Sequence, residues 1–223
     1  MIEVLFERLR EMEASKRFNG SSYPSELVPF PRRLVGQGFF PGGNGLWRSD
    51  EPAKMRAPST CQFPENGIMF LGNDFGSVFG FSRLKLHENP PTWRHLRVRL
   101  RHANIDGEIG FYTNAFLGLR NDRNALAHPI NDKQYDQFCG EFLEFQILTQ
   151  RPKLIVILGE RPNTLFRQVV SCNFASVGTV AKASLGSLLT NVITVSHPYS
   201  DLNKSDNEKL SEGLILSRAW QSA

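Results

Sequence analysis

Apolar residues recur along the chain at two kinds of spacing, one typical of helices and the other of buried strands. Near the start, Ile2, Leu5, Phe6, Leu9 and Met12 are three or four residues apart, which predicts an amphipathic helix. From residue 67 onward, short apolar runs alternate with longer segments of helical periodicity. The runs predict strands at residues 68–71, 109–113, 154–158 and 192–196, and the periodic segments predict helices at residues 92–102, 133–150 and after Pro162.

The two longer predicted helices each carry one apolar stripe. In residues 92–102 the stripe is Trp93, Leu96 and Leu100, and in residues 133–150 it is expected to be Phe138, Phe142, Phe145 and Leu148. Three arginines, Arg94, Arg97 and Arg101, lie opposite the first stripe. A solvated helix face is the preferred interpretation of these arginines, and contact with nucleic-acid phosphates is the alternative.

Alternation of continuous apolar strands with helices is typical of a parallel sheet that is covered on both faces. The sequence therefore predicts an α/β fold, a three-layer α/β/α sandwich around a mainly parallel four-stranded sheet. The length of 223 residues suits a single domain, with two small domains as the alternative. Residues 1–66 comprise the first helix and an irregular segment rich in glycine and proline, which is expected to wrap the sheet or line a site, and residues 67–203 form the core.

Composition narrows the class of protein without identifying it. With 40% hydrophobic and 22% charged residues the chain is typical of a globular protein, and no apolar run approaches the roughly 20 residues that cross a bilayer. The charged N-terminus does not resemble a signal peptide, so a soluble, cytoplasmic, monomeric protein is expected, with no membrane association. Three separated cysteines favour reduced thiols, and the net charge of +4 tolerates an anionic partner without requiring one.

Ligands of parallel α/β sheets bind beyond the carboxyl ends of the strands. Four places meet that condition here, namely residues 72–76, Asn114, Gly159 and residues 197–200. In a tight turn after the first strand, Asp74 could orient or deprotonate a water, although such residues more often cap a helix or close a turn. Asn114 could read the edge of a heterocycle or equally cap a turn, and His197 could stabilise a departing anion.

Four segments in this order resemble the uracil-DNA glycosylase superfamily. They read GIMFLGNDFG, FYTNAFLGL, CGEFLEFQILTQRPKLIVILGERP and ITVSHPYSDLN, and they span residues 67–203. The first is similar to the water-activating loop of the family, the second to its uracil-recognising strand and the fourth to its HPS loop. The third is similar to the branch that carries an iron–sulfur cluster. The resemblance implies a DNA glycosylase that removes uracil or another damaged base from DNA.

The resemblance also implies roles for individual residues. Asp74 and His197 would be catalytic, the first near the sugar and the second near the leaving base. The residues that would bind the base are Asn73, Phe75, Asn114 and a stacking aromatic, either Phe79 or Phe81. The residues that would contact DNA are Gly76, Pro198, Tyr199, Ser200 and the minor-groove wedge Leu202.

Several positions depart from the family pattern. Only Cys139 remains of the cluster cysteines, with Gly118 where another would stand, so no metal and no other cofactor is expected. Gly76 replaces the tyrosine that excludes thymine, Phe75 replaces a proline and Tyr199 replaces a small residue. A protein of the same fold that binds a nucleobase or nucleic acid without catalysis is therefore the alternative. A serine hydrolase using His197 and Asp74 is weaker, because the sequence has no G-x-S-x-G motif.

Overall fold

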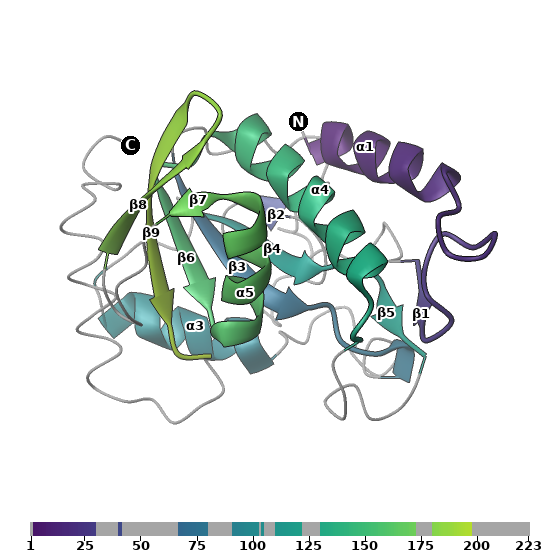
Figure 1. Cartoon of the computed structure of the whole chain (residues 1–223). Helices are drawn as coiled ribbons and strands as arrows, with labels where there is room; N and C mark the ends of the chain where they lie inside the picture. Colours follow the sequence, from purple (N-terminus) through teal and green to yellow (C-terminus); the bar gives the residue numbers. More distant parts are fainter. Residues whose placement is uncertain are drawn as a thin grey trace.

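The computed structural model describes residues 2–29, 40–41, 67–79, 91–102, 104, 110–121, 130–172 and 180–197 (Figure 1). Four helices are found in these ranges, namely α1 (Ile2–Ala14), α3 (Pro91–His102), α4 (Lys133–Gln150) and α5 (Glu160–Val169). The longer strands are β3 (Ile68–Asp74), β4 (Gly110–Phe116), β6 (Leu154–Leu158), β8 (Val180–Leu185) and β9 (Leu188–Val195). The short ones are β1 (Leu27–Val28), β2 (Phe40–Pro41), β5 (Leu119–Arg120) and β7 (Ser171–Cys172).

The main sheet has seven strands in the order β2-β4-β3-β6-β9-β8-β7. The four central strands β4, β3, β6 and β9 run parallel, which agrees with the predicted α/β class. Strand β2 at one edge and strands β8 and β7 at the other pair antiparallel, so the sheet is mixed and wider than expected. A second sheet joins only β1 and β5.

Helices cover both faces of this sheet (Figure 1). One hydrophobic cluster joins α1, α4 and α5 to alternate residues of the central strands, such as Leu71 and Ile157. The other joins Leu96 and Leu100 of α3 to the intervening residues, such as Phe70 and Val156. Because successive residues of a strand point to opposite faces, the cluster to which a buried strand residue belongs shows toward which face of the sheet its side chain points.

Helix α4 has the predicted bounds but presents a different stripe to the core. Asp132 caps it by accepting hydrogen bonds from the backbone amides of Gln134 and Tyr135. Leu148 is 43% exposed, so its assignment to the inner stripe was wrong. The buried residues of the helix are Tyr135, Phe138, Cys139, Gly140, Phe142, Leu143, Gln146, Ile147 and Gln150. Their spacing of three and four keeps the polar Gln146 inside, where it bonds Thr113.

Several predicted boundaries need correction, including that of β9, which was expected at residues 192–196 and runs over Leu188–Val195. Strand β3 continues to Asp74, and β4 continues through Asn114 to Phe116, because the pairing of the two strands extends that far. Asp74 therefore ends a strand instead of lying in a tight turn. Helix α5 begins at Glu160 rather than after Pro162. A proline is tolerated in the first helical turn, where the backbone amide has no partner within the helix.

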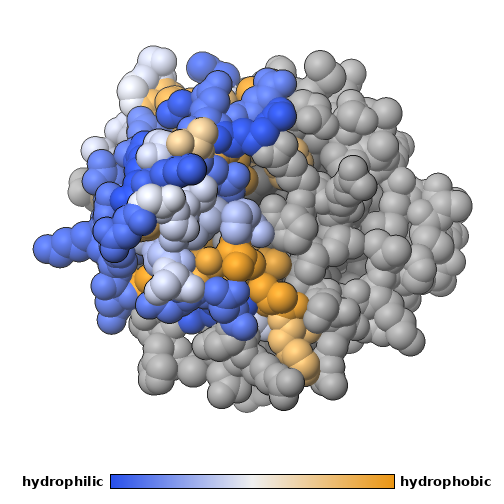
Figure 2. All heavy atoms as spheres, turned by 90° about the vertical axis from the view of Figure 1, so that its right-hand side faces the viewer, coloured by the Kyte–Doolittle hydropathy of each residue, from blue (hydrophilic) through white to orange (hydrophobic). Residues whose placement is uncertain are grey.

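The irregular N-terminal segment touches the sheets at two described places. Phe40 and Pro41 extend the main sheet by pairing with Tyr112 and Phe111, and Leu27 and Val28 pair with β5. Residues 30–39 and 42–66 lie outside the described residues. Figure 2 shows that the described surface on the side of α1 is largely hydrophilic, with a narrow apolar strip. No helix in the described part of the chain is long and apolar enough to cross a membrane.

Candidate functional site

The order of the central strands identifies the edge at which a ligand is expected. From β3 the chain passes through α3 to β4 on one side, and from β4 it passes through α4 to β6 on the other side of β3. Connections therefore diverge between β3 and β6, and α3 and α4 lie on opposite faces. In open α/β sheets such a reversal leaves a binding position beyond the carboxyl ends of the two strands. Asp74 and Gly159 stand at those ends.

Strand pairing brings Asp74, Asn114 and His197 to this same edge. Asn114 pairs with Gly72, and Leu158 pairs with Val195. Because Leu71 of β3 pairs with Ile157 of β6, these two pairs lie at the same level across the four strands. Asp74 follows Gly72 by two residues and His197 follows Val195 by two residues. With about 4.8 Å between neighbouring strands, roughly 10 Å separates the backbones of β3 and β9.

The surroundings of the three side chains differ in the layer from which they come. Asn114 lies two residues beyond Tyr112, and His197 two beyond Val195, and both reference residues pack with α3. Strand alternation therefore directs Asn114 toward the face covered by α3. His197 lies beyond the end of β9, where the charges of Arg99 and His95 on α3 act on it. The carboxylate of Asp74 instead contacts arginines of β5 and α5. Strand pairing thus places the carboxyl ends of β3, β4 and β9 at one edge of the sheet, and the binding of a ligand there stays a prediction.

The carboxylate of Asp74 is held by donors on both oxygens. Its Oδ1 accepts a 3.0 Å hydrogen bond from the backbone amide of Gly76, and its Oδ2 accepts one of 3.0 Å from Nδ2 of Asn73. The amide oxygen of Asn73 is buried and has no hydrogen-bond partner among the described residues. An unsatisfied buried acceptor beside a candidate site is a position that a ligand donor would complete.

Two arginines that the sequence analysis missed also face Asp74. Arg120 and Arg161 place a guanidinium nitrogen 3.7 Å and 3.9 Å from its Oδ2. The guanidinium of Arg161 lies over the ring of Phe116, 4.1 Å from its centroid, which fixes its position. Arg161 lies shortly after a predicted strand end, in the segment LGERP, and this position could have identified it as a candidate site residue. No local sequence pattern indicates Arg120 as a site residue.

His197 is half-buried at the end of β9, next to Gly159. A side chain at Gly159 would meet the Cβ of His197 at 3.5 Å, and the φ of Gly159 is +104°, which favours glycine. Burial lowers the pKa of His197, and the charges of Arg99 and His95 lower it further, while Asp74 opposes them. The lowered pKa keeps the imidazole neutral at neutral pH.

Behind His197 lies Arg99 of α3, which the sequence analysis also missed. Its Nη1 donates to the carbonyl of Ser196 at 2.8 Å, and its Nη2 donates to the carbonyl of His197 at 3.4 Å. A signal for it was available, because Arg99 lies three residues after Leu96 and falls within the apolar stripe instead of opposite it. Arg101 is exposed, and the side chains of Arg94 and Arg97 lie outside the described residues.

Asn114 is 5% exposed and sits within β4 rather than beyond its end. Its neighbour Thr113 points to the other face, where its hydroxyl donates to Oε1 of Gln146 at 2.7 Å. That bond links β4 to α4 beneath the site. The hydrogen bond to α4 therefore helps to fix the orientation of β4, on which the direction of the Asn114 side chain depends.

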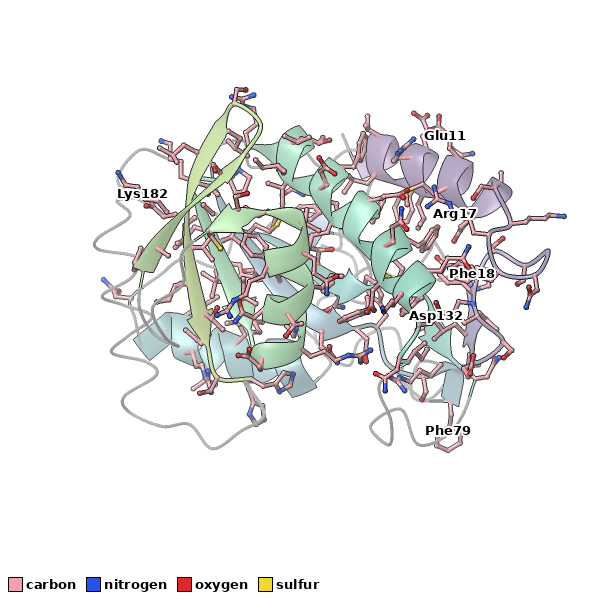
Figure 3. The ribbon with its side chains drawn as sticks, viewed as in Figure 1. Glu11, Arg17, Phe18, Phe79, Asp132 and Lys182 are labelled. Carbon is pink, nitrogen blue, oxygen red and sulfur yellow. The ribbon has the colours of Figure 1, made fainter. Side chains whose placement is uncertain are left out.

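The aromatic candidates do not join the site in the same way. Phe75, expected to contact the base, is 6% exposed and packs into the core cluster of α4 and α5, because the chain turns there to the opposite face. Phe79 is half-buried, and its ring points away from the body of the chain (Figure 3). Phe81 lies outside the described residues, as do the remaining expected DNA contacts, Pro198, Tyr199, Ser200 and Leu202. Gly76 has a φ of +82°, and a Cβ added there would meet nothing within 4 Å.

The one buried cysteine of the described residues is a structural thiol. The Sγ of Cys139 accepts a hydrogen bond from the amide of Leu117, next to Gly118. Burial raises the pKa of Cys139 to about 12, so the thiol stays protonated at neutral pH.

Comparison with known proteins does not extend this picture. The sequence matches no protein-family model and shows significant similarity to no curated protein.

Proposed function

We propose that this chain is a DNA glycosylase that hydrolyses the N-glycosidic bond of uracil or a related damaged base in DNA, within a uracil-DNA glycosylase-like fold. One observation carries the proposal: a carboxylate, an amide and an imidazole lie at one edge of the sheet, at or near the carboxyl ends of β3, β4 and β9. The order of the four sequence segments that resemble the family supports the same assignment.

The chemistry requires opposite charges to be stabilised at two places. Water adds to C1′ of the sugar, the bond from C1′ to the base nitrogen breaks, and the base leaves with the electron pair. The transition state is cationic at the sugar and anionic at the base. A fixed anion is needed near the sugar and a hydrogen-bond donor near the base. Asp74 supplies the first and His197 the second.

A neutral imidazole suits this division of labour. Because burial lowers its pKa, His197 keeps one ring N–H at neutral pH and can donate it to an oxygen of the departing base. The base then leaves as a stabilised anion. The attacking water releases one proton to solvent as it becomes the hydroxyl on C1′, and the base anion takes up one proton from solvent, so the reaction balances. Asp74, with donors already on both oxygens, acts as an oriented negative charge that also positions the attacking water.

Recognition of the base would precede cleavage. A base inside a duplex is out of reach, so the nucleotide must rotate out at a cost of a few kcal/mol. Asn114 would then pair with the edge of the base through its amide. The unsatisfied oxygen of Asn73 lies beside Asp74 and offers a second acceptor.

A uracil-containing oligonucleotide tests the proposal. Single-stranded and duplex forms, incubated with the protein and then with alkali, should break at the uracil. Asp74→Asn and His197→Ala should each slow excision by about 100- to 1,000-fold, the usual loss for one well-aimed group. Lys182→Met, on the outer hairpin away from this edge, should cleave at the wild-type rate.

The variants distinguish catalysis by this protein from cleavage by a contaminating glycosylase, and from binding of the oligonucleotide without cleavage. Asp74→Asn protein purified in the same way would carry any contaminating glycosylase, so equal cleavage by it and the wild type contradicts the proposal. Binding of the oligonucleotide without scission, on a panel that also contains thymine opposite guanine, hypoxanthine and xanthine, would favour a binding protein instead.

A further inference from the structure

The side chain of Arg99 is 0% exposed although it carries a permanent charge. It lies on α3 between Leu96 and Leu100, at the interface with the sheet. Burial of a guanidinium is unfavourable unless hydrogen bonds replace its water, so its partners reveal what it stabilises. Two of its partners are the carbonyls of Ser196 and His197.

These two carbonyls follow the last residue of β9, Val195, where the ladder with β6 stops. The planar fork of the guanidinium holds both at once, at 2.8 Å and 3.4 Å. A lysine ammonium has no such fork and acts as a single point of charge. Arg99 therefore fixes the backbone that carries His197, from a helix nearly a hundred residues earlier in the chain.

The same guanidinium also acts on the imidazole through its charge. After burial, Arg99 is the next cause that lowers the pKa of His197, followed by the opposing effect of Asp74 and a smaller lowering by His95 of the same helix. Gly159, the neighbour of His197 just beyond β6, has no side chain. The geometry and the charge act together, because both depend on one side chain behind the loop.

We propose that Arg99 is a positioning residue for His197, which holds the backbone of residues 196 and 197 and so orients the imidazole toward the site. The proposed function enters only the activity part of this inference. Arg99 itself does not contact the substrate, since its guanidinium is buried and turned to the backbone of residues 196 and 197.

The experiment compares Arg99→Met, Arg99→Lys and Arg101→Met. Arg101→Met removes the same charge from an exposed position of the same helix. The ring protons of His197, assigned with a His197→Ala variant, are titrated by NMR. Arg99→Met should raise the pKa of His197, whereas Arg101→Met should leave it close to that of the wild type. An unchanged titration in folded Arg99→Met overturns the proposal.

Excision kinetics provide the second measurement. Arg99→Met should lower kcat by about 100-fold, the loss expected from a small displacement of a reacting group, with little change in KM. Arg99→Lys should retain a lowered pKa of His197 but show reduced kcat, because one ammonium cannot hold two carbonyls. If Arg99→Met does not fold, Arg99→Lys tests the positioning role instead. A kcat of Arg99→Lys equal to that of the wild type overturns that role.

The two measurements fail independently. A shifted His197 titration in a protein whose wild type excises no base supports the positioning role and removes the proposed function. An unshifted titration in a protein that excises uracil removes the positioning role and leaves the proposed function.

Discussion

The hydrogen bond between Thr113 and Gln146 offers a quantitative test of the packing beneath the site. The hydroxyl donates to Oε1 at 2.7 Å, and the two residues are 0% and 1% exposed. Thr113→Val keeps the shape of the side chain but leaves that oxygen buried without its donor. An unsatisfied buried group of this kind costs about 1–3 kcal/mol. For a chain of this size the melting temperature should fall by roughly 2–12 °C.

Urea denaturation of four proteins measures the pair. The set is the wild type, Thr113→Val, Gln146→Met and the double variant. Each single variant leaves one buried polar group without its hydrogen-bond partner, while the double variant removes both groups. The loss of unfolding free energy in the double variant should therefore be smaller than the sum of the losses in the two single variants. A coupling free energy of about 0.5–3 kcal/mol is expected for residues in direct contact. Thr164→Val, at an exposed position of α5, should change stability by no more than about 0.5 kcal/mol.

Two results would refute this reasoning. Additive single-variant effects would mean that the two side chains do not interact in solution. A Thr113→Val protein as stable as the control would mean that Gln146 finds another donor or is hydrated. Either result would remove the link by which α4 fixes the pleat of β4 below Asn114.

Three further predictions concern the same edge and the layer beneath it. Gly159→Ala should lower the unfolding free energy by about 1–3 kcal/mol in a urea titration, because a φ of +104° strains any residue with a Cβ; an unchanged midpoint would contradict this. With Cys61 and Cys172 replaced by serine, Cys139 should not react with a thiol reagent at mildly alkaline pH until the chain unfolds, since burial raises its pKa to about 12; rapid modification of the folded chain would show otherwise. Burial lowers the pKa of His197 below 6.5, so the unfolded chain binds this proton more readily, and stability should be full above about pH 6.5 and decline below it. A His197→Ala variant with the same acid-side decline would assign that loss to other groups.

Sequence patterns predicted the elements that are apolar and continuous. The bounds of α4 and β6 match the expectation because an unbroken apolar run and a long helical period leave few alternatives. The hairpin of β8 and β9 was predicted only in its last part. Lys182, Ser184 and Asn191 interrupt its apolar pattern: Lys182 and Ser184 are exposed on β8, and the half-buried Asn191 donates to the carbonyl of Lys153.

The candidate site was predictable to the extent that it lies at strand ends. Asp74, Asn114 and His197 each follow or end an apolar run, and the rule for parallel sheets then unites them. Arg120 and Arg99 were not predictable in the same way. Their partners are 46 and 97 to 98 residues away in the chain, a separation that only the folded sheet closes.

The central claim is that one base sits between Asn114 and His197 with its sugar toward Asp74. A crystal structure with a duplex whose deoxyuridine carries fluorine at C2′, a substitution that slows cleavage by destabilising the cationic sugar, tests this directly. The account predicts an extruded uracil whose edge meets the amide of Asn114, whose oxygen meets the imidazole, and whose C1′ faces the carboxylate. A uracil still stacked in the duplex, or bound away from the carboxyl edge of β3, β4 and β9, would contradict it.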